Sequence, residues 1–215
     1  MTTALLQTTY FGPVQWYQKL QRYDRCLIEQ YDSYQKQTFR NRCLIATANG
    51  VQALTVPTVS SGSDGGDEKC LVKDIRISDH NNWRRNHWNA LQSAYKESPF
   101  FDYYADDIRP FFEQRYDFLV DFNEAIRQKV CELLDIHPHV EQTSSFRPPL
   151  SLDADNDAPL DDFRDVIHAK HPQADADFQP KEYWQVFRHK HGFLPNLSIL
   201  DLLFCMGPES IYYIT

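Results

Sequence analysis

Two short polar stretches carry the side chains best suited to chemistry, and the first lies at residues 34–42, which read YQKQTFRNR. In an extended segment, Arg40 and Arg42 point to the same side and can clamp a phosphate or carboxylate group. Lys36 adds a point charge, and Asn41 offers both a hydrogen-bond donor and an acceptor. The stretch is therefore a candidate substrate-binding site for an anion. The alternative is a polar edge strand whose charges prevent aggregation.

The second stretch, residues 79–88, reads DHNNWRRNHW. Its spacing predicts the start of a helix, and a helix N-terminus offers free N–H groups to an anion. Arg84 and His87 are three residues apart and share one helix face, while Asp79 and His80 stand at the start, where His80 can contact substrate. We interpret His87 as a general base, Arg84 as the stabiliser of developing negative charge and Asp79 as the group that orients the imidazole. The alternative is that His87 is a hydrogen-bonded structural residue.

The chain is rich in aromatic residues, with 14 Phe, 12 Tyr and 4 Trp. Tyr10, Trp16 and Trp88 are candidates for stacking on the sugar or the base of a ligand. Core packing is the commoner use of such rings, because each ring buries a large apolar area. The composition therefore predicts a well-filled core and leaves a stacking surface as the second interpretation.

Residues 153–161 (DADNDAPLD) resemble the opening of a calcium-binding loop, because acids stand at positions 1, 3, 5 and 9. Ala158 replaces the glycine of position 6 and Arg164 the glutamate of position 12, so a solvated acidic loop is the better interpretation. The histidine pairs lack the spacing of zinc sites, and the glycine-rich phosphate-binding motifs are absent from the sequence. The sequence therefore indicates no metal site and identifies no cofactor.

The elements that must position these residues begin with a strand, a helix and a second strand. We expect the strands at 4–9 and 25–30, with a helix that starts at Pro13 between them. Such a βαβ unit implies parallel pairing and a right-handed crossover.

A hairpin follows, because Asn49-Gly50 is the strongest short signal for a tight turn between two strands. We therefore predict an α/β fold with a mixed, partly parallel sheet, a β-hairpin insertion, flanking helices and a single core. Asp79–Asn82 and Asp117 are expected to cap two of the helices. The remaining predicted strands are 43–48, 51–56, 71–77 and 211–214, and the remaining predicted helices are 83–95, 106–114, 117–134, 160–170 and 197–206.

The region from 143 to 180 differs in character from the rest of the chain. Prolines interrupt it and aspartates dominate it. We expect long loops there, part of them mobile, with one short helix at 160–170. The whole chain, 1–215, is predicted to be a single domain that carries this loop-rich acidic segment.

The formal net charge is −8, which disfavours nucleic-acid binding because that function normally requires a basic surface. Residues 36–85 nevertheless carry eight Lys or Arg and five Asp or Glu, a net of +3 that leaves −11 for the rest of the chain. A local cationic stretch in an acidic protein favours a small anionic ligand such as a nucleotide sugar.

No stretch approaches the roughly 20 apolar residues of a membrane-spanning helix, and residues 1–10 lack the features of a signal peptide. We therefore expect a cytoplasmic protein without a membrane span. No two cysteines form a CxxC pair, and those within apolar runs are expected in the core. The latter are Cys26, Cys43, Cys131 and Cys205.

Several blocks of sequence stand in a distinctive order. YFGPVQWYQKL begins at Tyr10, KQTFRNRCLI at Lys36 and ISDHNNWRRNHWNAL at Ile77, and HGFLPNLSILDLL and MGPES follow near the end. In this order the blocks resemble the WbqC-like protein family, over residues 5–134 and 182–210. The chain departs from the family's pattern at Thr8-Thr9, where many members have a Gln-Pro pair.

The resemblance implies a bacterial protein of O-antigen or other surface-polysaccharide biosynthesis, and a transfer of glycine or another aminoacyl group onto a sugar. It also implies that the polar features at 36–42 and 83–87 recur in the family. We therefore expect a transferase that acts on an activated sugar, with His87 activating a hydroxyl or an amine. The alternative is a non-catalytic binding or scaffold protein of polysaccharide assembly, which predicts an exposed aromatic patch. Fold analogy alone suggests a nucleotidyltransferase-like enzyme.

Overall fold

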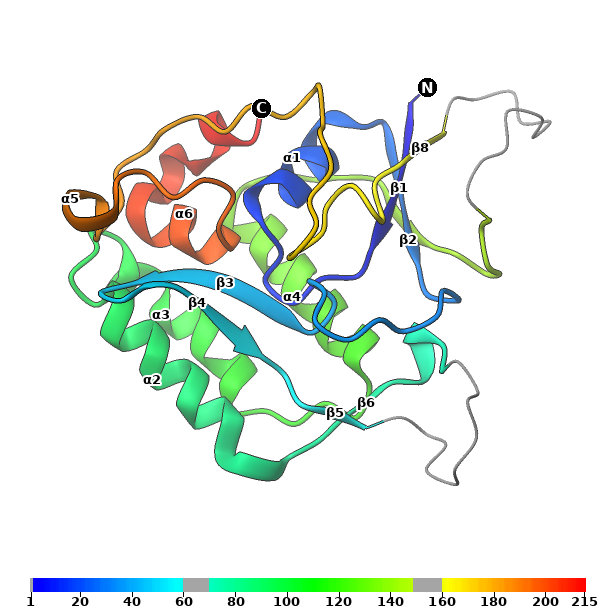
Figure 1. The fold of residues 1–215 in the computed structure, drawn as a ribbon, viewed down its shortest axis with the longest axis horizontal. Coiled ribbons are helices and arrows are strands. Elements are labelled where there is room, and N and C mark those ends of the chain that lie inside the picture. The colour runs from blue at the N-terminus through cyan, green and yellow to red at the C-terminus, as the bar shows by residue number, and fades with distance from the viewer. Residues whose placement is uncertain (1, 60–69, 149–159) are drawn as a thin grey trace.

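The computed structural model describes residues 2–59, 70–148 and 160–215. Its largest sheet has four parallel strands in the order β7-β2-β1-β8, and Figure 1 shows β1, β2 and β8 side by side at one end of the molecule. The carboxyl ends of these strands therefore meet at one edge of the sheet. The strands are β1 (Thr3–Gln7), β2 (Arg25–Glu29), β7 (Val140–Gln142) and β8 (Leu160–Asp162).

The chain begins with the predicted βαβ unit. β1 and β2 pair in parallel with Leu5 opposite Leu27, and α1 (Val14–Arg22) connects them. Every residue of β1 is buried, which is typical of a parallel strand covered on both faces. The indole N–H of Trp16 on α1 donates to the carbonyl of Gln7 over 2.9 Å, so the helix and the end of β1 are fixed to each other.

The predicted hairpin consists of β3 (Arg42–Thr47) and β4 (Gly50–Thr55). Gly50 has a φ of 101°, in the region that L side chains rarely adopt. The hydroxyl of Thr47 donates to the carbonyl of Gly50 over 2.8 Å and closes the turn. The prediction of an α/β fold with a partly parallel sheet and an inserted hairpin is confirmed.

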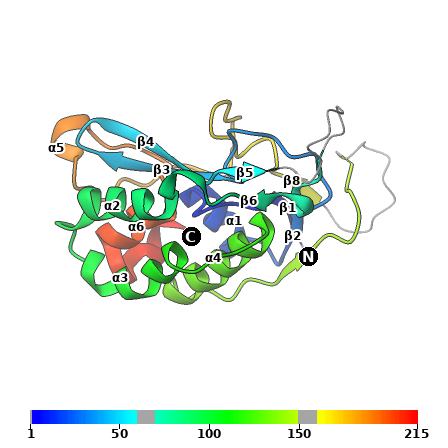
Figure 2. The ribbon, with the colours of Figure 1, turned by 90° about the horizontal axis from the view of Figure 1, so that it is seen from below.

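Helices fill the space between the sheet and the hairpin. Figure 2 shows the hairpin covering one side of α2 and α6, with α3 on the opposite side. Buried apolar side chains from the sheet, the hairpin and the helices join in one core cluster. The helices beyond α1 are α2 (Trp83–Tyr95), α3 (Phe101–Ile108), α4 (Leu119–Leu133), α5 (Arg188–His191) and α6 (Ile199–Met206).

The strand predicted at 71–77 is mostly wrong. This segment contains a 3₁₀ helix (Val72–Asp74) and then the two-residue strand β6 (Arg76–Ile77), which pairs with β5 (Thr58–Val59). Its buried side chains Val72 and Ile75 are three residues apart, which is the period of a 3₁₀ turn.

Two predictions near prolines also need correction. The strand predicted at 211–214 is wrong, because these residues follow Pro208 in a 3₁₀ helix (Gly207–Tyr213) or at its end. The helix predicted at 106–114 starts earlier, as α3, and its second half is a 3₁₀ helix (Arg109–Phe112). Pro110 lacks the N–H that an α-helical bond requires, which accounts for the change of helix type.

The capping predicted for Asp79–Asn82 and for Asp117 is wrong. At the start of α2 and of α4, as the structure describes them, no side chain makes a capping hydrogen bond. The chain enters α2 through Asn81 and Asn82, whose φ angles are 64° and 48°. Asparagine tolerates this left-handed conformation better than most residues. Asn81 and Asn82 therefore allow the backbone to turn into α2 and do not cap it with their side chains.

The helix predicted at 160–170 is wrong, since the segment opens with β8 paired to β1. The chain that follows lies against α1. The Nζ of Lys19, a side chain with no exposed surface, is 2.7 Å from the Oδ2 of Asp175, and the amide of Gln15 donates to the same oxygen over 2.8 Å. Residues 149–159 of the loop-rich segment predicted at 143–180 lie outside the described residues. Most of the calcium-like pattern at 153–161 falls on them.

Candidate functional site

Polar and charged side chains gather where the four parallel strands end. Gln7 and Glu29 are the last residues of β1 and β2 and are partners in register. Ligands of open α/β sheets bind outside the carboxyl ends of the strands, so this edge is the candidate site. We call the following residues the carboxyl-edge cluster: Gln7, Glu29, Asp32, Arg40, Thr143, Asp162 and Arg164.

The most deeply buried ion pair of the cluster joins β2 to the end of β8. The side chains of Glu29 and Arg164 are 1% and 6% exposed, and Oε2 lies 3.4 Å from Nη1. The hydroxyl of Thr143 donates to Glu29 over 2.9 Å, and two backbone N–H groups also donate to this carboxylate. Burial opposes the charged form of Arg164, but the hydrogen bonds and charge of Asp162 outweigh burial and raise its pKa.

Arg40 reaches the cluster from the connection between β2 and β3. It is 2% exposed, and its Nη2 donates to the Oδ2 of Asp32 over 2.7 Å. Its carbonyl accepts from the side-chain amide of Asn123 on α4 over 2.8 Å. Burial lowers the pKa of Arg40, against the opposing charges of Asp32 and Asp165. Arg40 thereby orients Asp32, whose side chain is 21% exposed and reaches solvent.

The two residues after Arg40 contain buried polar atoms without a hydrogen-bond partner. The side-chain amide of Asn41 donates to the carbonyl of Val56 over 2.9 Å. Among the described residues, however, its Oδ1 and the Nε of Arg42 have no such partner. Buried polar groups are normally paired, so these two atoms are exceptions that the described residues do not satisfy.

Cationic side chains stand at the rim of the cluster. Lys36 is exposed, and the amide oxygen of the adjacent Gln37 accepts from Lys170. This contact brings the segment after β8 against the first polar stretch. Burial, with smaller contributions from positive neighbours that include Arg40, lowers the pKa of His168. Of the first predicted stretch, Arg40 therefore contacts the carboxyl-edge cluster, whereas Arg42 is the first residue of β3 and is paired with Thr55 of β4. The binding roles predicted for the stretch stay predictions.

His87, the predicted general base, lies on α2 in a buried aromatic surrounding. It is 6% exposed, its Nδ1 is 2.9 Å from the hydroxyl of Tyr10, and its ring also hydrogen-bonds to the carbonyl of Thr55. With Nε2 donating to that carbonyl, Nδ1 accepts from Tyr10 and the ring is neutral. Burial lowers the pKa of His87 to about 4. These surroundings fit a structural histidine better than a general base, and the catalytic role stays a prediction.

Asp79 does not orient the imidazole in this structure. Its carboxylate pairs with Arg84 and lies 3.5 Å from Arg115, and the hydrogen bond from Arg84 lowers its pKa. The groups that orient the ring of His87 are Tyr10 and the Thr55 carbonyl. Asp79 and Arg84 therefore form a surface ion pair at the start of α2.

The charged side chains of the two predicted stretches form separate ion pairs, since Arg40 pairs with Asp32 and Arg84 with Asp79. The stretches nevertheless meet through the hairpin, because the Thr55 backbone that binds His87 belongs to the register partner of Arg42. His80 is exposed, and its Nδ1 lies 2.5 Å from the hydroxyl of the nearby Ser78. Its substrate-binding role stays a prediction.

The rings predicted to stack on a ligand lie mostly inside the protein. Tyr10 has no exposed surface, and Trp16 is 2% exposed. Trp88 is half-buried and packs against Phe101 and Phe112, with ring centroids 5.8 and 5.7 Å away. A ring without exposed surface offers no face to a ligand, so core packing accounts for Tyr10 and Trp16.

Glu29, Asp32 and Arg164 were not predicted as site residues. The strand-end rule could have found the first two, because both stand at or just after the end of a predicted parallel strand. Arg164 carried no such signal, since the strand that precedes it was not recognised. Asp32, which with Asp162 is one of two partly exposed carboxylates of this cluster, is therefore a result of the structure.

The pKa of His87 predicts a specific dependence of stability on pH. Above pH 6.5 the ring is neutral in both the folded and the unfolded chain and contributes no pH dependence. As the pH falls from 6.5 towards 4, the unfolded chain takes up a proton that the folded chain excludes. This difference should lower the free energy of unfolding by about 3 kcal/mol, measured by urea unfolding at a series of pH values.

The control separates His87 from the carboxylates that titrate in the same range. His87→Gln should lose this part of the pH dependence, whereas His137→Gln, at a side chain that is 86% exposed, should retain it. Parallel pH curves for the wild type and His87→Gln would contradict the buried, neutral ring.

A parallel sheet with a polar carboxyl edge, an inserted hairpin and covering helices makes the chain an α/β protein. The WbqC-like protein family matches residues 7–213, and the chain belongs to this family, as the sequence blocks predicted. It is 24% identical over 232 residues to the uncharacterized protein Rv1507c of Mycobacterium tuberculosis, which covers 98% of this chain and 96% of that protein. No solved structure matches the chain.

Within the ranges that the structure covers, no helix combines the length and the apolar character needed to cross a membrane. In the same ranges, no group of three His, Cys, Asp or Glu side chains is arranged to hold a metal ion. The four cysteines predicted in the core are buried, and all five cysteines are free thiols.

Proposed function

We propose that this WbqC-like protein is a transferase that binds an activated sugar at the carboxyl-edge cluster. The observation that carries the proposal is the pair of Arg40 and Asp32. A buried guanidinium holds a partly exposed carboxylate at the end of β2 over 2.7 Å. A carboxylate held in one orientation at the ligand-binding edge of a parallel sheet is suited to acid–base work.

We assign the binding of the anionic part of the ligand to Lys36 and Arg42, which we call the cationic rim of the cluster. Lys36 is exposed and Arg42 is partly exposed, and the Nε of Arg42 has no hydrogen-bond partner within the described chain. Guanidinium and ammonium groups form charge-assisted hydrogen bonds with phosphate. A sugar carried on a nucleoside diphosphate is therefore the ligand class that we propose, in line with the local positive charge of this part of the sequence.

Asp32 is assigned the proton transfer. In an aminoacyl transfer, a hydroxyl or amino group of the sugar attacks the carbonyl carbon of an activated aminoacyl donor. The new ester or amide bond forms as the bond to the donor's carrier breaks, and the proton passes to Asp32 and then to the leaving carrier. The hydrogen bond from Arg40 holds the carboxylate of Asp32 in place during this step.

The cellular setting is part of the same proposal. Family membership supports a role in O-antigen or related surface-polysaccharide biosynthesis. We place the protein in the cytoplasm, where thiols stay reduced, since all five of its cysteines are free.

A thermal-shift screen tests the proposal. Its ligands are nucleotide sugars, nucleoside diphosphates, aminoacyl donors and divalent metals. A bound nucleotide sugar at 100 times its dissociation constant should stabilise the fold by about 2.7 kcal/mol. Lys36→Ala or Arg42→Ala should weaken that binding about tenfold or more, the effect of one lost hydrogen bond to a charged group.

Lys96→Ala is the matched control, because it removes an exposed lysine after the end of α2. It should leave the affinity unchanged. If no nucleotide sugar stabilises the wild type, or if the control weakens binding as much as the rim variants, the proposed site is wrong.

A further inference from the structure

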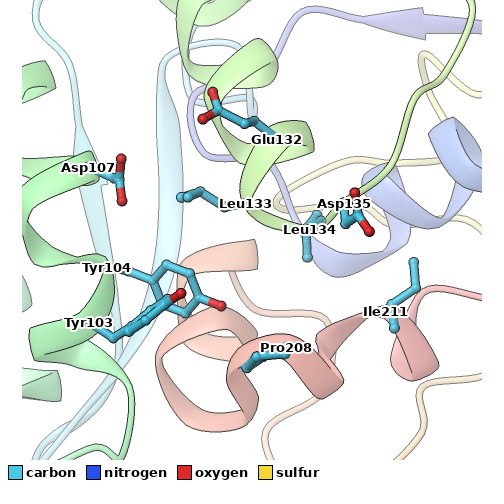
Figure 3. Close-up of a pocket in the computed structure, with 9 residues that line it drawn as sticks. All are labelled: Tyr103, Tyr104, Asp107, Glu132, Leu133, Leu134, Asp135, Pro208 and Ile211. Atoms are coloured by element: carbon cyan, nitrogen blue, oxygen red, sulfur yellow. The ribbon is translucent and has the colours of Figure 1, made fainter.

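A groove between α3 and α4 lies apart from the carboxyl-edge cluster. At one end is a hollow of about 400 Å³. Figure 3 shows Tyr103 and Tyr104 of α3 on one side of it, Leu133 and Leu134 at the end of α4 on another, and Pro208 and Ile211 on a third. The floor is therefore largely apolar and aromatic.

A second hollow of about 410 Å³ continues the first along the same two helices. The two hollows share Asp107 and Glu132 in their linings, so they adjoin where Lys129 reaches both carboxylates. From Leu134 to Ala125, the groove follows α4 for nine residues, which corresponds to about 14 Å of helix. This length matches two to three turns of a docked helix.

Both walls of the groove are acidic. Asp106 and Asp107 stand on α3, and Glu132 and Asp135 stand on or just after α4. One ammonium group faces them within the lining that the structure describes, that of Lys129, at 2.8 Å from Glu132 and 3.6 Å from Asp107. Four carboxylates against one ammonium leave the groove with an excess of negative charge.

An aromatic ring stands free at the mouth of the groove. Tyr103 is 72% exposed and meets Tyr104 edge-on, with ring centroids 4.8 Å apart. Exposed tyrosines beside an apolar floor are the residue type that carries binding energy at protein interfaces. The ring thus offers a docking contact that the fold itself does not use.

We propose that this groove docks a cationic amphipathic helix of a partner protein. The apolar face of that helix packs on the floor beside Tyr103, and its lysines or arginines pair with the carboxylates of the two walls. Helix-in-groove recognition uses this combination of an apolar stripe and flanking charges. The proposal does not depend on the chemistry assigned to the carboxyl edge.

A pair of model peptides tests it: a 14-residue leucine–lysine amphipathic helix labelled for fluorescence anisotropy, and the same helix with glutamate in place of lysine. The wild-type protein should bind the lysine helix and not the glutamate helix. Tyr103→Ala, and the double variant Asp107→Asn/Glu132→Gln, should each weaken binding about tenfold or more. These variants should stay folded. Tyr103 is an exposed side chain, and asparagine and glutamine have nearly the same shape as the aspartate and glutamate that they replace.

Asp121→Asn is the control, because it removes an exposed carboxylate from the same helix outside the groove. It should leave binding unchanged. If Asp121→Asn lowered the affinity for the lysine helix as much as the groove variants do, the helix would be binding to the protein's overall negative charge. That result would overturn the proposal. Absence of binding to the lysine helix, or self-association of the protein through this face in sedimentation, would overturn it as well.

Discussion

Replacing Arg164 with methionine should lower the free energy of unfolding by about 3–5 kcal/mol, because Glu29 would keep a buried charge without its ion-pair partner. The two side chains are 6% and 1% exposed. Arg164 also donates to the carboxylate of Asp162 over 2.6 Å and to the carbonyl of Arg147 over 2.8 Å. Methionine retains much of the side-chain volume, so the loss reports mainly on charge and hydrogen bonds. Urea unfolding followed by tryptophan fluorescence measures it.

Arg147→Met is the matched control for this prediction. Its side chain is exposed, and it contacts Glu29 through its backbone N–H alone, so its stability should stay within about 0.5 kcal/mol of the wild type. The double variant Glu29→Gln/Arg164→Met should recover part of the loss, because the unpaired charge is removed. If Arg164→Met unfolds as the wild type does, the carboxyl-edge cluster is not the buried network described above.

Replacing Asp32 with asparagine should slow the proposed transfer about a hundredfold to ten-thousandfold, the contribution of a positioned general base. Asparagine keeps the shape and the hydrogen bond from Arg40 but cannot take a proton at neutral pH. The loss should therefore appear in kcat, while the affinity for the nucleotide sugar changes much less. Asp32→Glu, which restores the carboxylate, should regain part of the rate. The measurement is the rate of transfer with the donor and acceptor that the binding screen identifies.

Asp165→Asn separates this chemistry from a general effect of charge. Asp165 is exposed, and its charge acts on Arg40 as that of Asp32 does. Its removal should change the rate only slightly. An equal loss in both variants would indicate an effect of the local field, and an unchanged rate in Asp32→Asn would end the assignment of Asp32 as the base.

Much of the fold followed from local signals in the sequence. Asn49-Gly50 predicted the turn of the hairpin, because a two-residue hairpin turn requires positive φ angles and few residue types other than Asn and Gly adopt them readily. The helix predicted at 83–95 has the bounds of α2, since its apolar residues recur with the helical period along its full length. Signals of this kind belong to one element and need no knowledge of its neighbours.

The outer strands of the parallel sheet had no such signal. β7 and β8 have three residues each, too few to show a period of two, and β8 is Leu-Asp-Asp, a composition typical of a loop. Their pairing depends on the edges of β1 and β2, which are distant in sequence. Arg164 could not be placed in a site before its strand was known.

The sequence also could not reveal the hydrogen-bond partners of His87. Residue type and spacing place it on a helix face with Arg84, but they do not show that Tyr10 and Thr55 occupy both nitrogens of the ring. The contact with Tyr10 joins residues 77 positions apart. Arg40 was predicted as a binding residue after the second strand, whereas its ion-pair partner Asp32 became apparent only when the course of the connection between β2 and β3 was known.

Hydrogen–deuterium exchange with the nucleotide sugar from the binding screen tests the central claim most directly, because it locates the ligand without a substitution. The account predicts slower exchange in peptides covering 29–42 and 160–168, with no change in 79–88. Protection confined to 79–88 would instead place the ligand beside His87 and Arg84, and would contradict the assignment of the site to the carboxyl edge of the sheet.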